Sequence, residues 1–333
     1  MDPIDVTKEP TIIISGLPGK MATLVAETIL KRDDMKLLRE GLTGPNQPQY
    51  FTTPAGYDFL LFTPERHFTV LETWANSLTN PIIVDFTQPD AVNRNAGLYC
   101  RFGSPFVMGT TGGDRKALEQ IVIDSGNVAV IAPNMAKQIV ALQAFIEDFS
   151  VKNENTMQDY RLEVRESHQQ GKKDTSGTAK AMISYFNRLG IPFRVEDIVM
   201  IRDPEMQRKM GVPEEYLSGH GWHTYKIWTD TETKTQPLDE LKSEFHQFFN
   251  NSSAFNGCTR LLEHPYMKAE SLDGNVLVMA HDSGDNELII THNINGRQVY
   301  ADSTIDAIRF LTRKVEAGIR GEVYSMIDVL RGK

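Results

Sequence analysis

The chain has 333 residues, a length that suggests about two domains rather than one small module. Apolar residues make up 40% of the chain, so a core of ordinary size can form. The chain carries 35 Lys and Arg against 44 Asp and Glu. The resulting formal net charge of −9 has the wrong sign for binding nucleic acid on a broad basic face, so we expect no nucleic-acid partner and a local site for any anionic ligand.

The sequence favours a reducing compartment and predicts no membrane span. Cys100 and Cys258 are too few for a disulfide framework and lack the spacing of a metal cluster. The longest apolar runs, such as residues 59–62, are far shorter than the roughly 20 residues that cross a bilayer. The first five residues are acidic where a secretory signal is basic, and they lack the Arg and Ser of a transit peptide. We therefore expect a cytoplasmic or already processed protein.

The first half of the chain alternates strand-like and helix-like segments. A β-branched run at residues 11–15 precedes a Gly-Leu-Pro-Gly turn, and apolar residues then recur at helical spacing from Met21 to Ile29. Further buried-type strands are predicted at residues 35–38, 59–62, 82–86, 106–108 and 128–131. This α/β pattern predicts a Rossmann-type, doubly wound parallel sheet. We expect a dinucleotide-binding domain that comprises residues 1–134 and 302–333.

The second half is richer in strands and predicts an α+β domain with an open mixed sheet over residues 135–301. It begins with a helix at residues 135–151. Strands are predicted at residues 160–167, 195–201, 224–228, 275–280, 287–293 and 297–300. Residues 303–306 resemble a capping box that opens a last helix, which we place on the first domain.

The turn after the first strand has the outline of a dinucleotide site. Its residues open a helix, where free backbone N–H groups and the helix dipole can hold a pyrophosphate. The fingerprint is imperfect because proline stands where a loop glycine is usual and removes one N–H. A plain strand-to-helix turn is the alternative. The candidate cofactor-binding residues here are Gly16, Leu17, Pro18, Gly19, Lys20 and Met21.

The acidic residue that usually binds the ribose hydroxyls is not clearly present after the second strand. Glu40 could serve, but Arg39 and the following Thr43-Gly44 turn would also suit a 2′-phosphate. Both charges could equally be solvated surface groups. On this pattern we expect NADPH to be favoured, with NADH also accepted.

Two further loops fall at the carboxyl edge of the predicted sheet, where open α/β folds bind ligands. The loop after residues 106–108 has glycines that allow a flat ring to approach the backbone, although a tight turn capped by threonine would look the same. The next loop alone would be interpreted as a linker. Their candidate residues are Gly109, Thr110, Thr111, Ala132, Pro133, Asn134 and Met135.

Residues 166–179 form the most concentrated polar stretch of the chain and join a strand to a helix. Ser176, Gly177 and Thr178 begin that helix, where free N–H groups and two hydroxyls can bind a carboxylate. His168 and Lys172 can relay a proton and contact a second carboxylate. The alternative is a solvated loop with a helix cap, but so many complementary groups in eleven residues favour a site.

The remaining histidines are weaker candidates. His220 and His223 suit a strand with a turn, and the sequence places no third ligand near them, so no metal site is predicted. We expect His292 to be structural or near the domain junction.

Taken together, these stretches resemble dihydrodipicolinate reductase (4-hydroxy-tetrahydrodipicolinate reductase), and more closely its plant-type branch. The similar stretches are spread over most of the chain, and the one from His168 to Thr178 is the most specific. The others are residues 16–22, 84–89, 109–112, 132–135 and 291–297.

The resemblance implies an enzyme of lysine and diaminopimelate biosynthesis that reduces a cyclic, dicarboxylated unsaturated imine to tetrahydrodipicolinate with NAD(P)H. His168 then matches the acid/base histidine of the family and Lys172 its proton donor. Ser176, Gly177 and Thr178 match its carboxylate-binding turn, and the three loops of the first domain match its nucleotide-binding loops. Thr111 is expected to reach the substrate as well. Gln169 stands where bacterial members have a second histidine, and its amide can still donate to a carboxylate.

Partners and location also follow from the resemblance. Plant-type members suggest a homodimer and bacterial ones a tetramer, and the location would be the plastid stroma if a transit peptide has been removed. Residues 230–273 look like an insertion whose amphipathic helix at residues 238–249 serves assembly or domain closure, for example by covering a sheet edge. Two alternatives stay open: another two-domain NAD(P)-dependent imine or amino-acid reductase, and a non-catalytic NADP-binding redox sensor.

Overall fold

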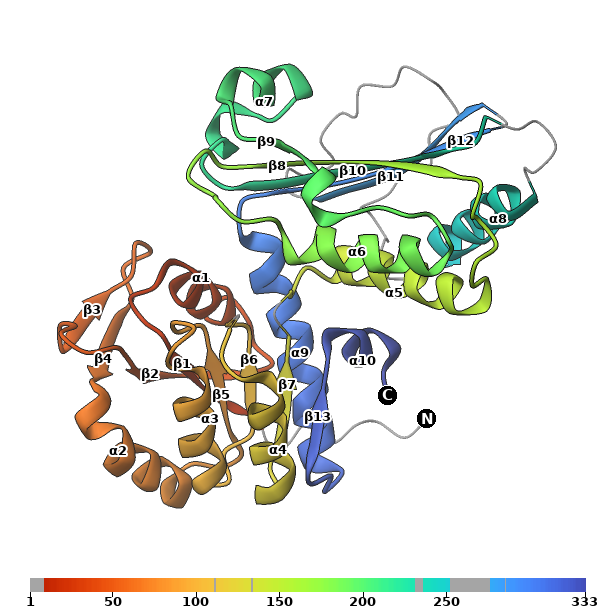
Figure 1. Ribbon diagram of the computed structural model, residues 1–333. Helices are drawn as coiled ribbons and strands as arrows, with labels where there is room; N and C mark the ends of the chain where they lie inside the picture. Colours follow the sequence, from red (N-terminus) through yellow and green to blue (C-terminus); the bar gives the residue numbers. More distant parts are fainter. Residues whose placement is uncertain (1–8, 111, 133, 231–235, 252–275, 285) are drawn as a thin grey trace. The chain divides into compact units, whose positions relative to one another are not determined.

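The structure is a computed structural model that describes residues 9–110, 112–132, 134–230, 236–251, 276–284 and 286–333 (Figure 1). The chain forms two compact units. Unit 1 comprises Met1–Met135 and Tyr300–Lys333, and unit 2 comprises Ala136–Val299.

Unit 1 is built on an eight-stranded sheet in the order β13-β7-β6-β5-β1-β2-β4-β3. All neighbouring strands are parallel except β3, which is antiparallel to β4. Sequence patterns predicted β1 and five of the later strands but not the short edge strands β3 and β13. The strands are β1 (Thr11–Ser15), β2 (Lys36–Leu42), β3 (Tyr50–Thr52), β4 (Asp58–Phe62), β5 (Pro81–Asp85), β6 (Phe106–Met108), β7 (Val128–Ile131) and β13 (Glu322–Tyr324).

The central strands of this sheet are buried on both faces. Ile13 and Ile83 pack into an apolar cluster with residues of three helices, while Ile12 and Ile14, which point to the opposite face, are equally inaccessible. Burial on both faces is the signature of a doubly wound sheet, so the predicted Rossmann-type fold is confirmed. The helices of unit 1 are α1 (Lys20–Ile29), α2 (Pro64–Ser77), α3 (Val92–Arg101), α4 (Arg115–Ser125), most of α9 (Gln298–Glu316) and α10 (Met326–Arg331).

The C-terminal segment returns to unit 1, but its helix begins earlier than the sequence analysis predicted. Residues 297–300, predicted as a strand, instead lead into α9, because Gly296 adopts a left-handed φ of 74° and ends the preceding strand. The expected capping box at residues 303–306 lies inside α9, where the Thr304 hydroxyl donates to the Tyr300 carbonyl at 2.7 Å. Arg309 forms an ion pair with Asp34 at 2.6 Å and thereby ties α9 to the start of β2.

Unit 2 contains a five-stranded mixed sheet in the order β11-β12-β10-β8-β9. Every neighbouring pair is antiparallel except β8 with β9. The strands are β8 (Arg161–His168), β9 (Val199–Ile201), β10 (His220–Trp228), β11 (Val276–Gly284) and β12 (Glu287–Asn295). The helices are α5 (Lys137–Lys152), α6 (Gly177–Arg188), α7 (Pro204–Met210) and α8 (Gln236–Asn251), with short 3₁₀ turns at η1 (Val195–Asp197) and η2 (Glu214–Tyr216).

The strand predicted at residues 195–201 is shorter than expected. Arg194 and Asp197 form a two-pronged ion pair with both contacts at 2.9 Å, and the Asp197 N–H donates to the Arg194 carbonyl. These bonds close the turn η1, so only Val199–Ile201 remain extended as β9.

The helix of the expected insertion packs within its own unit. Leu238, Leu241 and Phe245 of α8 are buried, and the rings of Phe245 and Phe248 contact Phe145 of α5 with centroids 5.2 and 4.8 Å apart. The apolar stripe thus covers a neighbouring helix, where we had expected a sheet edge or a partner subunit. Most of residues 230–273 lies outside the described residues, as does Cys258.

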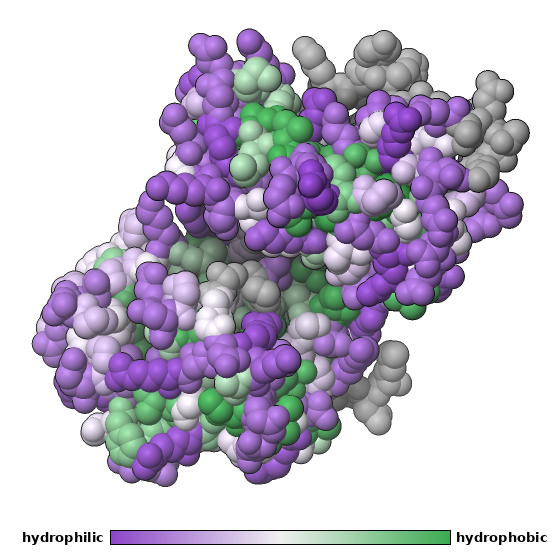
Figure 2. All heavy atoms as spheres, in the orientation of Figure 1, coloured by the Kyte–Doolittle hydropathy of each residue, from purple (hydrophilic) through white to green (hydrophobic). Residues whose placement is uncertain are grey.

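Hydrophilic side chains cover much of the visible face of both units, with smaller apolar patches between them (Figure 2). Within the described residues, no helix has the length and apolar character to cross a membrane.

Candidate active site

The loop after β1 in unit 1 presents backbone groups at the start of α1. Gly19 precedes the helix without a side-chain cap, and the exposed Lys20 is its first residue. Gly16 has a φ of 114°, and a Cβ at this position would lie 2.3 Å from the Phe86 carbonyl oxygen. Only glycine therefore allows this loop to pack against the chain that follows β5. The arrangement leaves the first N–H groups of α1 available to an anion.

Asp85, the last residue of β5, organises the neighbouring loops. Its side chain is fully buried and accepts hydrogen bonds from the hydroxyls of Tyr99 (2.7 Å), Thr87 (2.7 Å) and Thr110 (3.0 Å) and from the Asn95 amide (3.0 Å). Burial and the nearby carboxylate raise the pKa of Tyr99 well above its ordinary value, so its hydroxyl remains a donor. In the sequence, residues 84–89 stand out only as a stretch of resemblance, and no local pattern predicts this role of Asp85.

The structure places the loop after β6 beside that network. Thr110 is buried and its hydroxyl donates to the Asp85 carboxylate, so it helps to hold the loop in place. A Cβ at Gly109 would lie 2.2 Å from the Phe86 ring, so this glycine permits the close contact of two loops. Thr111 and Pro133 lie outside the described residues. Among the other candidates Ala132 and Met135 are buried and Asn134 is half-buried.

The two candidates on β2 have different surroundings. The Glu40 carboxylate accepts a hydrogen bond from the Trp74 indole at 3.0 Å, so it is engaged inside the unit. Arg39 is exposed, and its guanidinium lies over the rings of Tyr57 (4.8 Å) and Phe59 (5.5 Å). Arg39 thus keeps its hydrogen-bond donors at the surface, whereas the Glu40 carboxylate is occupied as the acceptor of the Trp74 indole.

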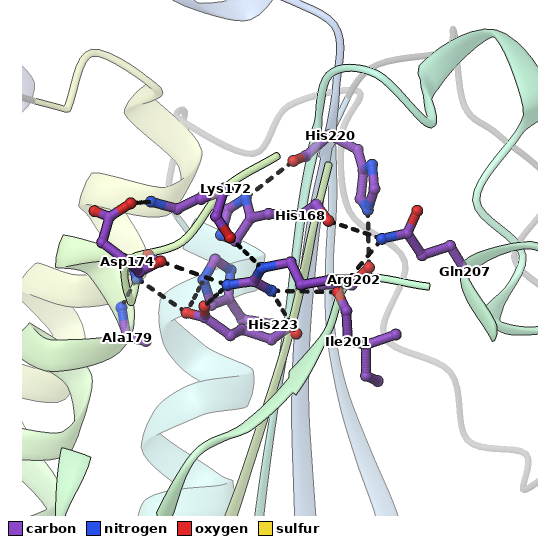
Figure 3. Close-up of polar contacts among 12 residues, drawn as sticks. His168, Lys172, Asp174, Ala179, Ile201, Arg202, Gln207, His220 and His223 are labelled. Carbon is purple, nitrogen blue, oxygen red and sulfur yellow. Dashed lines mark hydrogen bonds and ion pairs between the residues drawn. The ribbon is translucent and has the colours of Figure 1, made fainter. Parts of the chain in front are cut away.

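In unit 2 the end of β8, the loop 169–176 and the start of α6 bring the predicted residues together (Figure 3). The Ser176 hydroxyl accepts from the Ala179 N–H at 3.3 Å and caps α6, which confirms the predicted helix start. Gly177 is exposed and Thr178 half-buried. Gln169 is half-buried, and its carbonyl accepts from the Lys172 N–H at 2.9 Å. This turn makes the loop compact.

Lys172 forms an ion pair with Asp174 at 2.7 Å. The Lys172 side chain is 20% exposed and that of Asp174 is 78% exposed, so the ion pair lies at the surface with the carboxylate toward solvent. The same contact lowers the pKa of Asp174. An incoming carboxylate can therefore replace Asp174 at the Lys172 ammonium.

His168 is held in one tautomer. Its Nδ1 lies 3.0 Å from the His220 carbonyl, which can only accept, so Nδ1 carries the proton and Nε2 the lone pair. Nε2 is buried without a hydrogen-bond partner among the described residues. Burial lowers the pKa of His168 to about 4, aided by Arg202 and Lys172 and opposed by Glu166. The imidazole is therefore neutral at neutral pH. Gly221 lies opposite on β10, where a Cβ would come within 3.1 Å of the His168 ring.

A row of buried polar side chains crosses the sheet next to His168. Glu166 on β8, His223 on β10 and His292 on β12 are direct cross-strand partners and are all nearly inaccessible. The rings of His223 and His292 stack with centroids 4.6 Å apart. Burial lowers the pKa of His223 well below its ordinary value and that of His292 to about 3, so both rings are neutral.

One expectation about this row was wrong. The sequence placed no third ligand near His223, yet ligand atoms of Glu166, His168 and His223 lie within 4.8 Å of one another. Strand register brings them together, and no local pattern predicts it. The Glu166 carboxylate already accepts from Arg202 and from the Ser176 N–H (3.0 Å), and the adjacent guanidinium opposes another cation. We therefore assign Glu166 to a hydrogen-bond network with Arg202 and Ser176 and not to a metal, while both ring nitrogens of His223 are buried without a hydrogen-bond partner among the described residues.

Comparisons with known proteins identify the family. The N-terminal part of the family described as "Dihydrodipicolinate reductase" matches residues 10–135, and its C-terminal part matches residues 139–330. The chain is 36% identical to "Probable 4-hydroxy-tetrahydrodipicolinate reductase 2, chloroplastic" of Oryza sativa subsp. japonica, over 96% of this chain and 82% of that protein. It is 34% identical to "4-hydroxy-tetrahydrodipicolinate reductase 2, chloroplastic" of Arabidopsis thaliana, over 96% of this chain and 77% of that protein.

A solved structure supports the fold alone. It is the dipicolinate-bound dihydrodipicolinate reductase from Paenisporosarcina sp. TG-14, with a TM-score of 0.55 and 16% identity over 96% of this chain and 98% of that one. The family matches together span nearly all of the described chain, and the relatives agree with the resemblance found in the sequence. The chain belongs to the dihydrodipicolinate reductase family, whose members are nicotinamide-dependent oxidoreductases.

Proposed function

We propose that this protein reduces 4-hydroxy-tetrahydrodipicolinate (dihydrodipicolinate) to tetrahydrodipicolinate in lysine and diaminopimelate biosynthesis, with NADPH favoured and NADH accepted. The names of the relatives support the reaction. The observation that carries it is the gathering of His168, Lys172 and the start of α6 at one end of the sheet in unit 2. These groups offer two anion contacts and a proton source, as a dicarboxylated imine requires.

The start of α6 would hold one substrate carboxylate. Gly177 and Thr178 form its first turn, where the helix dipole favours a negative charge. The Ser176 hydroxyl accepts from Ala179 and keeps its own proton for donation. Lys172 would hold the second carboxylate after exchanging Asp174 for it. Both contacts are charge-assisted and orient the ring.

The nicotinamide, when bound, would supply a hydride to C4 of dihydrodipicolinate, the form of the substrate that remains after the 4-hydroxyl has left as water. Electron density then collects at C3 and the ring nitrogen, and a proton must neutralise it. The Lys172 ammonium can donate that proton. The neutral His168 cannot serve as an acid at neutral pH, but its Nε2 lone pair can accept a hydrogen bond from the substrate and orient it.

Unit 1 would hold the cofactor as the dinucleotide-binding domain, and unit 2 would bind substrate and mediate oligomerisation. The start of α1 and the Lys20 ammonium suit the pyrophosphate. Ser15, Asp85 and the glycines beside them hold the loops at the carboxyl edge of the sheet close together. Because the glycines have no side chain, the flat nicotinamide ring could approach the backbone there. Arg39 would bind the 2′-phosphate of NADPH through the donors that it keeps at the surface.

We further propose a homo-oligomer, a dimer in the first instance with a tetramer as the alternative. The chloroplastic relatives support a location in the plastid stroma if a transit peptide has been removed, and otherwise the cytoplasm is expected.

A coupled assay tests the proposed reaction. Dihydrodipicolinate is generated enzymatically in the cuvette, and oxidation of NADPH is followed after the purified protein is added. We expect oxidation that depends on both the protein and the generated substrate, together with formation of tetrahydrodipicolinate. Absence of NADPH oxidation under these conditions, with a folded protein, would contradict the proposal.

A further inference from the structure

Arg202 follows β9 directly, and its guanidinium group contacts several residues in and next to the loop 169–176 (Figure 3). Its Nε donates to the Lys172 carbonyl at 2.9 Å, and its Nη2 donates to the Asp174 carbonyl at 3.5 Å. Nη2 also forms an ion pair with the Glu166 carboxylate, and Nη1 donates to the Glu166 carbonyl at 3.3 Å. The Arg202 side chain is only 16% exposed, so water competes little for these donors.

Glu166 holds the other end of the same loop. Its second carboxylate oxygen accepts from the Ser176 N–H at 3.0 Å, immediately before α6 begins. The carboxylate is fully buried, so it depends on these partners for its stabilisation. Sheet register explains the pairing, because Glu166 on β8 lies opposite Met200 on β9 and Arg202 follows two residues later.

We propose that Arg202 and Glu166 are positioning residues for the reaction. Together they anchor the loop at Lys172, Asp174 and Ser176, and so fix both anion contacts of the substrate site before substrate arrives. Neither needs to touch the substrate. The inference rests on the proposed function and deepens it, because it names what orders the carboxylate site. A loop that is ordered before substrate arrives does not have to lose conformational entropy when substrate binds.

The geometry also explains why a lysine at position 202 could not make the same contacts as Arg202. A guanidinium presents donors in a rigid planar fork, and here the fork serves two backbone carbonyls of the loop and one carboxylate. An ammonium could neutralise Glu166 but could not reach the Lys172 and Asp174 carbonyls in the same geometry. The effect of Arg202→Lys therefore separates positioning from charge neutralisation.

The test compares Arg202→Ala, Arg202→Lys and Glu166→Gln with Arg194→Ala, a control that removes an exposed ion pair of the same unit. We expect Arg202→Ala to lower kcat/KM for the dicarboxylate about 100-fold, the scale of a misplaced catalytic group. Arg202→Lys should lose nearly as much, and the KM for NADPH should stay within about twofold of the unaltered protein. Added guanidinium at a concentration harmless to the unaltered protein should partly restore Arg202→Ala.

Hydrogen exchange gives a readout that does not depend on activity. Amides of residues 169–179 should exchange faster in Arg202→Ala than in Arg194→Ala. Full activity of Arg202→Lys together with unchanged hydrogen exchange at residues 169–179 would overturn the proposal. So would an equal rise in the KM for the dicarboxylate and the KM for NADPH in Arg202→Ala. If the unaltered protein oxidises no NADPH, the proposed function fails, and the exchange data alone then decide the positioning role. If Arg202→Ala does not fold, Arg202→Lys and Glu166→Gln are judged by the same measurements.

Discussion

Lys172 and its neighbour Lys173 offer a matched pair of substitutions at the residue scale. Lys172 is bonded to Asp174 and half-buried, whereas Lys173 is exposed. We expect Lys172→Ala to lower turnover by about 10²–10⁴-fold, the usual contribution of a general acid. Lys173→Ala should stay close to the unaltered protein because its charge lies in solvent. Steady-state kinetics in the coupled assay measures both, and similar losses in the two variants would contradict a specific role for Lys172.

The lowered pKa of His168 predicts how the free energy of unfolding depends on pH. Its pKa of about 4 in the folded chain lies below the ordinary value of 6.5, because burial disfavours the charged ring. Between these values the unfolded chain binds more protons, so the free energy of unfolding falls as pH drops from 6.5 toward 4. Above pH 6.5 the contribution of His168 is fully present.

The same ionisation should be absent from the activity profile near neutrality. We expect kcat/KM for the dicarboxylate to show no inflection from His168 near pH 6.5, and an acid limb only closer to 4. The pH profiles of the unaltered protein and of His168→Asn, whose amide can still donate to the His220 carbonyl, measure this. An inflection near 6.5 that disappears in His168→Asn would show that the ring titrates normally.

Arg39 tests the cofactor preference. If its exposed guanidinium binds the 2′-phosphate, Arg39→Ala should weaken NADPH binding by about 1–3 kcal/mol, the worth of a hydrogen bond to a charged group. NADH lacks that phosphate and should bind as before. Titration of both cofactors by fluorescence gives the two dissociation constants. An equal loss for NADPH and NADH would count against Arg39 as the 2′-phosphate ligand.

At the scale of elements, Asp85 connects the ends of β5 and β6 with α3. Its two oxygens accept from donors of three segments, namely Thr87 after β5, Asn95 and Tyr99 of α3, and Thr110 after β6. An amide in its place would turn one acceptor into a donor facing other donors. We expect Asp85→Asn to cost about 1–3 kcal/mol, the penalty of an unsatisfied buried group, and to weaken binding of both nicotinamide cofactors.

The control for this substitution is Asp90→Asn, an exposed position just beyond the same strand. Chemical denaturation gives the free energy of unfolding, and cofactor titration gives the affinities. If Asp85→Asn matched Asp90→Asn in both measurements, Asp85 would have no organising role in the loops.

At the scale of the whole molecule, a substitution in α8 tests what the insertion at residues 230–273 contributes. Its buried Phe245 packs edge-on against Phe145 of α5. We expect Phe245→Ala to destabilise the protein by about 3–5 kcal/mol through the cavity that it leaves. Turnover at a temperature where the variant is folded should be unchanged, because neither Phe245 of α8 nor Phe145 of α5 belongs to the loop 169–176 or to the start of α6.

Denaturation and the coupled assay, with light scattering to measure mass, separate the outcomes for this variant. A loss of turnover in folded Phe245→Ala would place α8 in the catalytic machinery. A change of mass alone would instead support the original expectation that the segment serves assembly.

Local patterns were sufficient for much of the fold. Hydrophobic periodicity and β-branched runs predicted β1, α1 and most later strands, because each pattern reports which face of an element is buried. The glycine turn and the polar stretch at residues 166–179 predicted the loops at strand ends for the same local reason. The polar stretch also supplied the family, since its residue types and spacing are specific.

The tertiary structure decided what periodicity cannot express. Arg202 meets Glu166 from 36 positions away, and His223 joins Glu166 and His292 through strand register. Asp85 likewise collects donors from three segments, and Gly296 shifts the start of α9. Periodicity reports the face of a strand but neither its neighbour nor its register, and these contacts depend on both. The sequence by itself thus determined the elements, the motif and the family, while the pairing of distant strands decided which side chains hold the reactive loop in place.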